Sequence, residues 1–125
     1  EDFECTLEML KRVRFDMTYS FIYSPRKGTP AADMECQIPE DVKGERFNRL
    51  LALQNDIALE KNKPMEGKII KVLCDGPSKN NDNVFSGRSE GNKIVLFDGD
   101  ESDIGKFTEL KITRAETFAL YGEKI

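Results

Sequence analysis

The spacing of hydrophobic residues changes at Pro64, and this change limits the folds available to the chain. Before Pro64, two long segments have hydrophobic residues at helical spacing. After it, hydrophobic residues alternate with polar residues in short runs separated by Gly, Asn, Asp and Ser. Asn62-Lys63-Pro64 is a natural helix stop, because the residue before a proline is disfavoured in helical geometry. We therefore predict an α+β protein with two parts, residues 1–62 and residues 63–125.

Two helices are predicted in residues 1–62. Phe3, Leu7 and Leu10 recur at helical spacing between about Asp2 and Val13, with acidic residues first and basic residues last, as the helix dipole favours. The second helix is predicted to start with Pro39 at its first position and to run to about Lys61.

A strand is predicted between these helices, at Met17–Tyr23, where bulky residues alternate with smaller ones. We interpret its aromatic residues as core rather than as a base-stacking platform. Ser24–Ile38 contains two prolines and a glycine and is predicted to be a loop. One strand cannot form a sheet alone, and the chain starts at Glu1 in what reads as a helix. We therefore expect a piece of a longer protein.

Residues 63–125 are predicted to form a small barrel, because closure removes the exposed edges of several short strands. We expect it to be five-stranded, antiparallel and OB-like. The predicted strands lie near Met65–Cys74, Val84–Arg88, Lys93–Phe97, Phe107–Thr113 and Thr117–Gly122.

Composition argues against independent catalysis and against a metal site. The chain has no histidine, and Cys5, Cys36 and Cys74 are scattered without a C-x-x-C pair. The acidic run Asp98–Asp103 has Asp103 at the sixth place, where a calcium loop needs glycine, so we interpret it as a polar connection. No segment has the apolar length needed to cross a bilayer and no secretory leader is visible, so we expect a cytoplasmic protein with reduced thiols.

Charge and loop composition together bear on RNA binding. The net charge is −4, but residues 63–125 are close to neutral, with ten basic and eleven acidic side chains. Lys79, Arg88, Asn92 and Lys93 lie in two turn-rich loops of this part. Arginine can hold a phosphate and stack on a base. For the first loop, which contains Lys79, a solvated turn is the better interpretation. For the second loop, which contains Arg88, Asn92 and Lys93, a charged loop and an RNA contact are equally good interpretations.

The chain resembles a known enzyme family in both parts. YSFIYSPRKGTPAADM at Tyr19–Met34 and the following IPEDVKGERFNRLLALQ resemble the bacterial and organellar tRNA methylthiotransferases, which are radical S-adenosylmethionine enzymes. The later stretches SKNN, GRSEGNKIVLFDG, GKFTELKIT and LYGE resemble the TRAM domain that ends these enzymes. The resemblance covers essentially all 125 residues in the right order.

This resemblance implies a fold and a function. Residues 1–62 would be the last helix–strand–helix of a radical S-adenosylmethionine barrel, and residues 63–125 a TRAM barrel that binds the tRNA anticodon stem-loop. The whole enzyme would add a methylthio group to C2 of N6-isopentenyladenosine beside the anticodon, using two 4Fe–4S clusters and S-adenosylmethionine. None of the three cysteines matches a cluster ligand, so we expect no catalytic residue, metal or bound cofactor in this chain. The RNA-binding residues carried over are Lys79, Arg88, Asn92, Lys93 and, more weakly, Arg114.

Two alternatives stay open from the sequence. One is a methylthiotransferase that acts on a ribosomal protein side chain, and the other is a stand-alone RNA- or protein-binding module. The expected partners are tRNA and the remainder of the parent polypeptide, with a dimer through exposed apolar surface of residues 1–62 as a further option.

Overall fold

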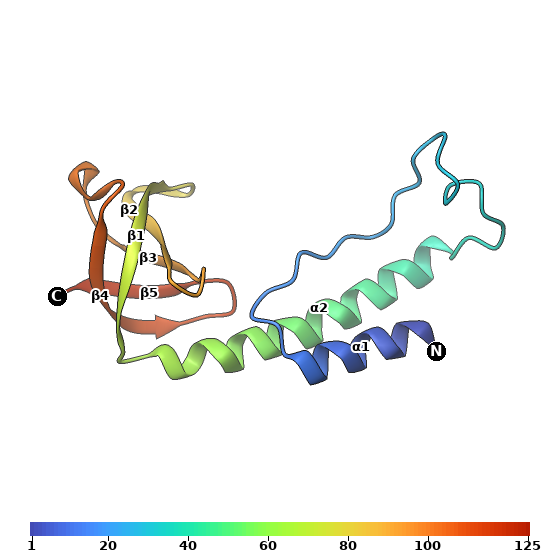
Figure 1. The fold of residues 1–125 in the computed structure, drawn as a ribbon, viewed down its shortest axis with the longest axis horizontal. Helices are drawn as coiled ribbons and strands as arrows, with labels where there is room; N and C mark the ends of the chain where they lie inside the picture. The colour runs from blue at the N-terminus through green and yellow to red at the C-terminus, as the bar shows by residue number, and fades with distance from the viewer. The chain divides into compact units, whose positions relative to one another are not determined.

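The computed structural model describes residues 1–125, which divide into two compact units, Glu1–Ile57 and Ala58–Ile125. No helix combines the length and the apolar character that a membrane span requires. The helices are α1 (Asp2–Val13) and α2 (Glu40–Asn62), and 3₁₀ turns occupy Lys63–Met65 and Glu101–Asp103 (Figure 1). The strands are β1 (Ile69–Ser78), β2 (Asn81–Ser89), β3 (Ile94–Asp98), β4 (Phe107–Ala115) and β5 (Leu120–Lys124).

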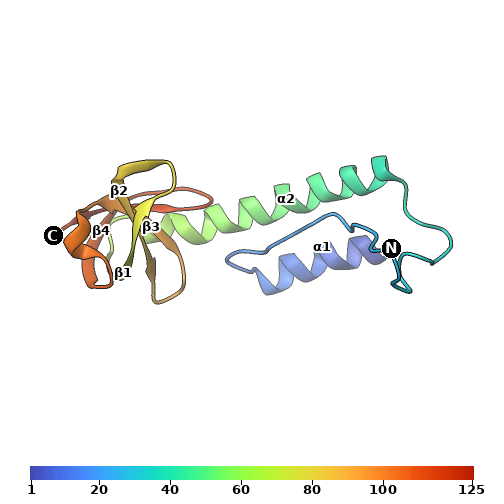
Figure 2. The ribbon, with the colours of Figure 1, turned by 90° about the horizontal axis from the view of Figure 1, so that it is seen from above.

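In the first unit, α1 lies alongside α2, as both ribbon views show (Figures 1 and 2). Arg49 Nη2 of α2 lies 2.6 Å from Glu4 Oε1 of α1, and its guanidinium lies 5.2 Å from the centre of the Phe3 ring. Leu7 and Leu10 provide the buried side chains of α1. Both helices therefore form where the periodicity predicts them, and α2 begins directly after Pro39.

The predicted strand at Met17–Tyr23 is wrong, because this segment has no regular secondary structure. Its aromatic residues are also not core: Tyr19 is 78% exposed and Phe21 is 84% exposed. A strand needs a neighbour that accepts and donates its backbone hydrogen bonds, and the first unit contains no other strand. The loop predicted at Ser24–Ile38 is confirmed, with turns between Lys27 and Asp33.

The second unit is built around a closed barrel whose strands follow the order β1-β2-β3-β5-β4. Five strands were predicted and five form. Four neighbouring pairs are antiparallel, but β3 and β5 are parallel, so the barrel is mixed rather than wholly antiparallel. The reason is geometric: in a closed ring with an odd number of strands, directions cannot alternate all the way round. β1 begins at Ile69 rather than at Met65, because the 3₁₀ turn precedes it.

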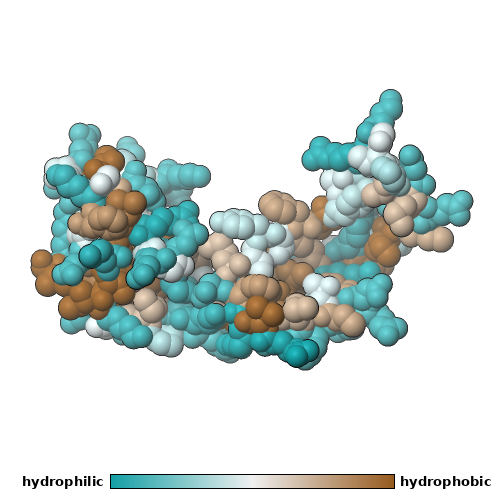
Figure 3. All heavy atoms as spheres, viewed as in Figure 1, coloured by the Kyte–Doolittle hydropathy of each residue, from teal (hydrophilic) through white to brown (hydrophobic).

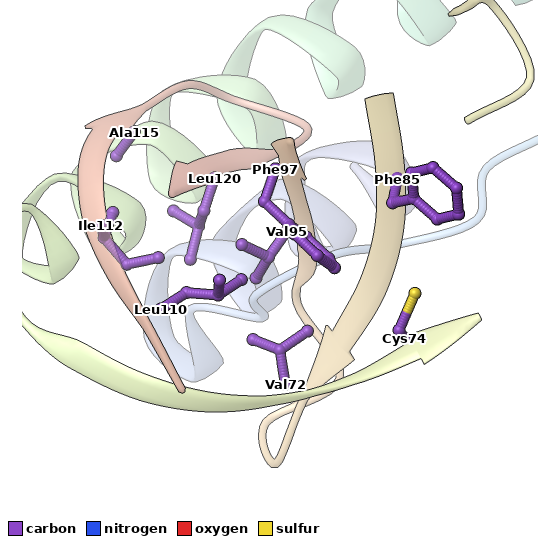
Figure 4. Close-up of a cluster of buried hydrophobic side chains, with 9 residues drawn as sticks. All are labelled: Val72, Cys74, Phe85, Val95, Phe97, Leu110, Ile112, Ala115 and Leu120. Atoms are coloured by element: carbon purple, nitrogen blue, oxygen red, sulfur yellow. The ribbon is translucent and has the colours of Figure 1, made fainter. Parts of the chain in front are cut away.

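The inward-facing side chains of the five strands form one continuous core (Figure 4). In β1 and β4 every second residue is buried over most of the strand, as expected when one face of a sheet packs inward. The core consists of Val72, Cys74, Phe85, Val95, Phe97, Leu110, Ile112, Ala115 and Leu120. Since the inner positions are filled by apolar side chains, the outer face of the barrel is left to present polar and charged groups to a ligand.

Candidate nucleic-acid interface

A row of three side chains crosses the outer face of three strands. Leu73 of β1 pairs with Phe107 of β4 on one side and with Arg88 of β2 on the other. Directly opposed residues of paired strands on one face bring their Cβ atoms to within about 5.5 Å of each other. Phe107 is 69% exposed and Leu73 is 36% exposed. The register therefore places an aromatic ring, an aliphatic side chain and a guanidinium side by side.

This row lies in a groove of about 880 Å³ on the barrel surface. Ile69, Leu73 and Phe107 supply much of its apolar lining, and Arg88 and Lys71 lie among its polar residues. Lys71 Nζ is 5.9 Å from the centre of the Phe107 ring, within the range of a cation–π contact. In the space-filling view of Figure 3, hydrophobic residues reach the surface of the barrel among hydrophilic ones. The groove thus combines apolar surface with positive charge.

Arg88 is held in place by neighbouring groups. Its Nη1 lies 3.4 Å from both the carbonyl oxygen and the Oδ1 of Asn92, and its Nε lies 3.8 Å from Asp75 Oδ2. Asn92 can accept these bonds because it adopts a left-handed backbone conformation with φ of 62° in the β2–β3 turn. All three contacts are long, so they orient the guanidinium while leaving it able to bind an anion.

Lys93 has a structural contact as well as a place at the groove. Its Nζ donates to Oδ1 of Asn62 over 2.7 Å, and Nδ2 of Asn62 donates to the carbonyl oxygens of Glu116 and Thr117 over 2.7 and 3.3 Å. Asn62 is only 6% exposed. The Lys93 ammonium therefore satisfies a buried amide at the end of α2.

The remaining two predicted residues lie outside the groove. Lys79 is exposed in the turn between β1 and β2. Arg114 lies on β4 with its guanidinium 4.0 Å from the centre of the Tyr121 ring and its Nε 3.4 Å from Glu116 Oε1. The structure brings Arg88, Asn92 and Lys93 together and separates Lys79 and Arg114 from them.

Sequence reasoning missed Lys71, Leu73 and Phe107 as residues of this groove. The signal was present in part, because alternation within Ile69–Ser78 and Phe107–Ala115 assigns all three to the outer face. What alternation cannot give is the register that sets Phe107 opposite Leu73. Only that register turns scattered outward residues into one surface.

The residues of this chain do not fit an iron–sulfur cluster. Cys5 and Cys36 are exposed, Cys74 is buried in the barrel core, and no three His, Cys, Asp or Glu side chains converge as metal ligands would. Burial raises the pKa of the Cys74 thiol above its ordinary value, which disfavours the thiolate that binds metals. Cys74 therefore serves as a packing residue.

The acidic loop that resembles a calcium site is a capped turn. Asp100 accepts hydrogen bonds from the backbone N–H and the hydroxyl of Ser102, and these bonds lower the pKa of its carboxyl group. Asp103 Oδ2 accepts from Lys124 Nζ at 2.5 Å and from the Asp100 N–H at 2.9 Å, and the Lys124 contact is the larger cause of the lowered pKa of Asp103. Both carboxylates are engaged in stabilising the loop.

Comparison with known proteins agrees with the resemblance drawn from the sequence. The chain is 51% identical over 125 residues to a protein of Clostridium botulinum strain Langeland, 52% over 122 residues to one of Acetivibrio thermocellus, and 50% over 125 residues to one of Clostridium novyi. Each relative is named tRNA-2-methylthio-N(6)-dimethylallyladenosine synthase. These matches cover 98–100% of this chain but only 25–28% of each relative, so the chain spans about a quarter of their length.

A family model for the TRAM domain matches residues 63–125, the segment that contains all five strands of the barrel and the groove. The division into compact units falls slightly earlier, between Ile57 and Ala58 within α2. The domain boundary at residue 62 stays a prediction. With its closed five-stranded barrel and this match, the chain belongs to the TRAM domain family.

Proposed function

We propose that this chain is the substrate-binding part of a tRNA methylthiotransferase, and that its barrel binds the anticodon stem-loop of tRNA. The reaction proposed for the whole enzyme is the addition of a methylthio group to C2 of N6-isopentenyladenosine next to the anticodon. Support comes from the names of relatives that are about half identical over the entire chain, together with the TRAM match over the barrel.

The observation that carries the binding role is the position of Arg88. Its guanidinium lies at the groove, is oriented by Asn92, and is part of a side chain that is 38% exposed. A guanidinium in this state can donate two parallel hydrogen bonds to a phosphate, which gives direction as well as attraction. Since residues 63–125 are close to neutral overall, we expect the affinity to be modest and sensitive to salt.

In this proposal the barrel contributes by positioning the RNA. Holding the stem-loop fixes the target adenosine relative to the reacting groups, and such positioning can supply a large part of a rate enhancement without a catalytic side chain. The 4Fe–4S clusters and S-adenosylmethionine would supply the radical and the methylthio chemistry. No group of side chains in this chain fits the ligands of a cluster, and we propose that the rest of a longer polypeptide holds both the clusters and S-adenosylmethionine.

The first unit has surface that suits a protein contact. Tyr19, Phe21 and Ile22 are exposed, and Phe21 and Ile22 line an apolar groove together with Phe47 of α2. Large exposed apolar surface usually marks an interaction site. We propose that this face packs against the remainder of the same polypeptide, and dimer formation by the isolated chain would argue for a second copy instead.

The binding role can be tested by fluorescence anisotropy with the 125-residue chain and a labelled anticodon stem-loop. Arg88→Ala is expected to weaken binding and to reduce the slope of log affinity against log salt by about one, because one phosphate contact is lost. Arg12→Ala is the matched control, since it removes the same charge from the exposed face of α1. Equal affinities for the Arg88→Ala variant and the unmodified chain would contradict the proposal.

A further inference from the structure

Phe107 is largely exposed at the start of β4. Its side chain is 69% exposed and borders a groove whose lining includes the aliphatic side chains of Ile69 and Leu73. Large aromatic side chains are favourable to bury, so a ring left in water beside other apolar groups indicates surface that a ligand can cover.

Positive charge flanks the ring on the same face. Lys71 Nζ lies 5.9 Å from the centre of the Phe107 ring, and Arg88 follows Leu73 in the cross-strand row. Carboxylates are also present, since Glu109 pairs with Lys71 across the strands and Asp75 lies near Arg88. Glu90 also lines the groove, and Leu73 and Phe107 stay exposed beside the cations.

A ligand complementary to this surface has a flat apolar face and a negative charge a few ångströms away. An unpaired nucleotide has both: its base stacks on an aromatic ring, and its phosphate is an anion that lysine and arginine attract. The faces of a base inside a duplex are covered by the neighbouring bases, so duplex RNA offers no apolar face to Phe107 and Leu73.

We propose that Phe107 and Leu73 form a stacking site for one unpaired base of the RNA, with Lys71 and Arg88 contacting the adjoining phosphates. This inference rests on the proposed function, which it deepens by naming a single-stranded nucleotide as the group bound in the groove. It assigns to Phe107 the role of reading RNA loop structure, while Arg88 alone would bind any phosphate backbone.

Phe118 provides a matched control within the same unit. It is also 69% exposed, yet it lies in the β4–β5 connection, in a different hollow lined by Lys63, Glu116 and Tyr121. Replacing either phenylalanine by leucine keeps an apolar side chain and removes the ring. Because both side chains are largely in water, neither replacement should unfold the barrel, which circular dichroism would verify.

The test uses the 125-residue chain with anticodon stem-loops that carry 2-aminopurine at one unpaired loop position at a time, and with a fully paired duplex of the same stem. The unmodified chain should bind the loop RNA more tightly than the duplex and should change 2-aminopurine fluorescence at one position. Phe107→Leu should weaken loop binding by about 5- to 100-fold and abolish that change. Phe107→Tyr, which keeps the ring, and Phe118→Leu should stay within about 2-fold of the unmodified chain.

The outcomes separate this inference from the proposed function. If loop RNA binds and Phe107→Leu binds it as tightly as the unmodified chain does, the stacking site is wrong while the RNA-binding role stands. Equal losses in Phe107→Leu and Phe118→Leu, or equal binding of loop and duplex, would also overturn the stacking site alone. Failure of the unmodified chain to bind either RNA would overturn the proposed function and the stacking site together.

Discussion

Lys93 Nζ and Asn62 Oδ1, 31 residues apart in sequence, are joined by a hydrogen bond of 2.7 Å. Asn62 is the last residue of α2 and is buried, and its Nδ2 donates to the carbonyl oxygens of Glu116 and Thr117. One buried amide therefore links the β2–β3 turn to the β4–β5 connection. A residue that looks from sequence like a helix stop thus stabilises the second unit.

We expect Asn62→Ala to lower the free energy of unfolding of the second unit by about 2 kcal/mol, because it removes buried hydrogen bonds and leaves their partners unsatisfied. Hydrogen exchange of the buried amides of Val95 and Leu110 measures this directly. Asn80→Ala, in the exposed β1–β2 turn, is the control and should change exchange little. Similar exchange in the two variants would show that the Asn62 contacts do not stabilise the unit.

Gly87 should tolerate no larger residue. A Cβ atom there would lie 2.4 Å from Val72 Cγ1 and 2.5 Å from the Leu73 carbonyl oxygen, so β1 and β2 could not keep their spacing. Gly87→Ala is expected to lower the free energy of unfolding of the barrel by about 1–3 kcal/mol. Gly44→Ala should have the opposite effect and raise the free energy of unfolding by about 0.5–1 kcal/mol, because Gly44 lies within α2 and a Cβ atom there would meet open space. Urea unfolding checks both, and a stable Gly87→Ala variant would refute the close approach.

Stability of the acidic loop should depend on pH in a direction set by Asp103 and Lys124. Their hydrogen bond lowers the pKa of Asp103 and raises the pKa of Lys124. The folded state binds fewer protons at Asp103 than the unfolded state, so this contribution is present at neutral pH and is lost as pH falls through the lowered pKa. The Lys124 contribution is lost only as pH rises through its raised pKa.

Asp103→Asn should therefore reduce the thermal stability of the chain at neutral pH and make the loss on acidification smaller than in the unmodified chain. The unfolding temperatures of Asp103→Asn and of the unmodified chain, each measured at about pH 7 and at about pH 3, show both effects. Asp82→Asn, on the exposed first residues of β2, is the control. Identical acid profiles for Asp103→Asn and the unmodified chain would exclude this ion pair as a source of stability.

Arg114 and Arg88 should contribute unequally to RNA binding. Arg114 stacks on the Tyr121 ring and contacts Glu116, and it lies outside the groove. We expect Arg114→Ala to lower affinity for the stem-loop by less than Arg88→Ala does, as measured by anisotropy at the same salt concentration. A larger loss for Arg114→Ala would move the binding surface to the β4–β5 side of the barrel.

Local patterns predicted most of the elements correctly. Both helices follow from the spacing of residues such as Leu7 and Leu10 and from Pro39, and the strands follow from alternation between turns rich in Gly, Asn and Asp. These features depend on neighbours within a few positions, which a sequence displays directly. The strand predicted at Met17–Tyr23 failed because strand formation depends on a partner, and the first unit offers none.

The candidate site could be predicted only in part. Arg88 and Asn92 were predicted as RNA contacts because they are close in sequence and carry suitable groups; the structure shows that they contact each other, and their RNA-binding role stays a prediction. Phe107 and Leu73 come together through the β1–β4 register, which is fixed by packing of the whole barrel. The contact between Lys93 and Asn62 likewise depends on folding, so composition could not separate its structural role from RNA binding.

The central claim is that the barrel groove binds the anticodon stem-loop, and an NMR titration of the isotopically labelled chain tests it most directly. At physiological salt, unlabelled stem-loop should shift the amide signals of Lys71, Leu73, Arg88 and Phe107 first and most. Signals of α1 should move little. If no signals shift, or if the largest shifts fall within Glu1–Ile57, the barrel is not the RNA-binding surface.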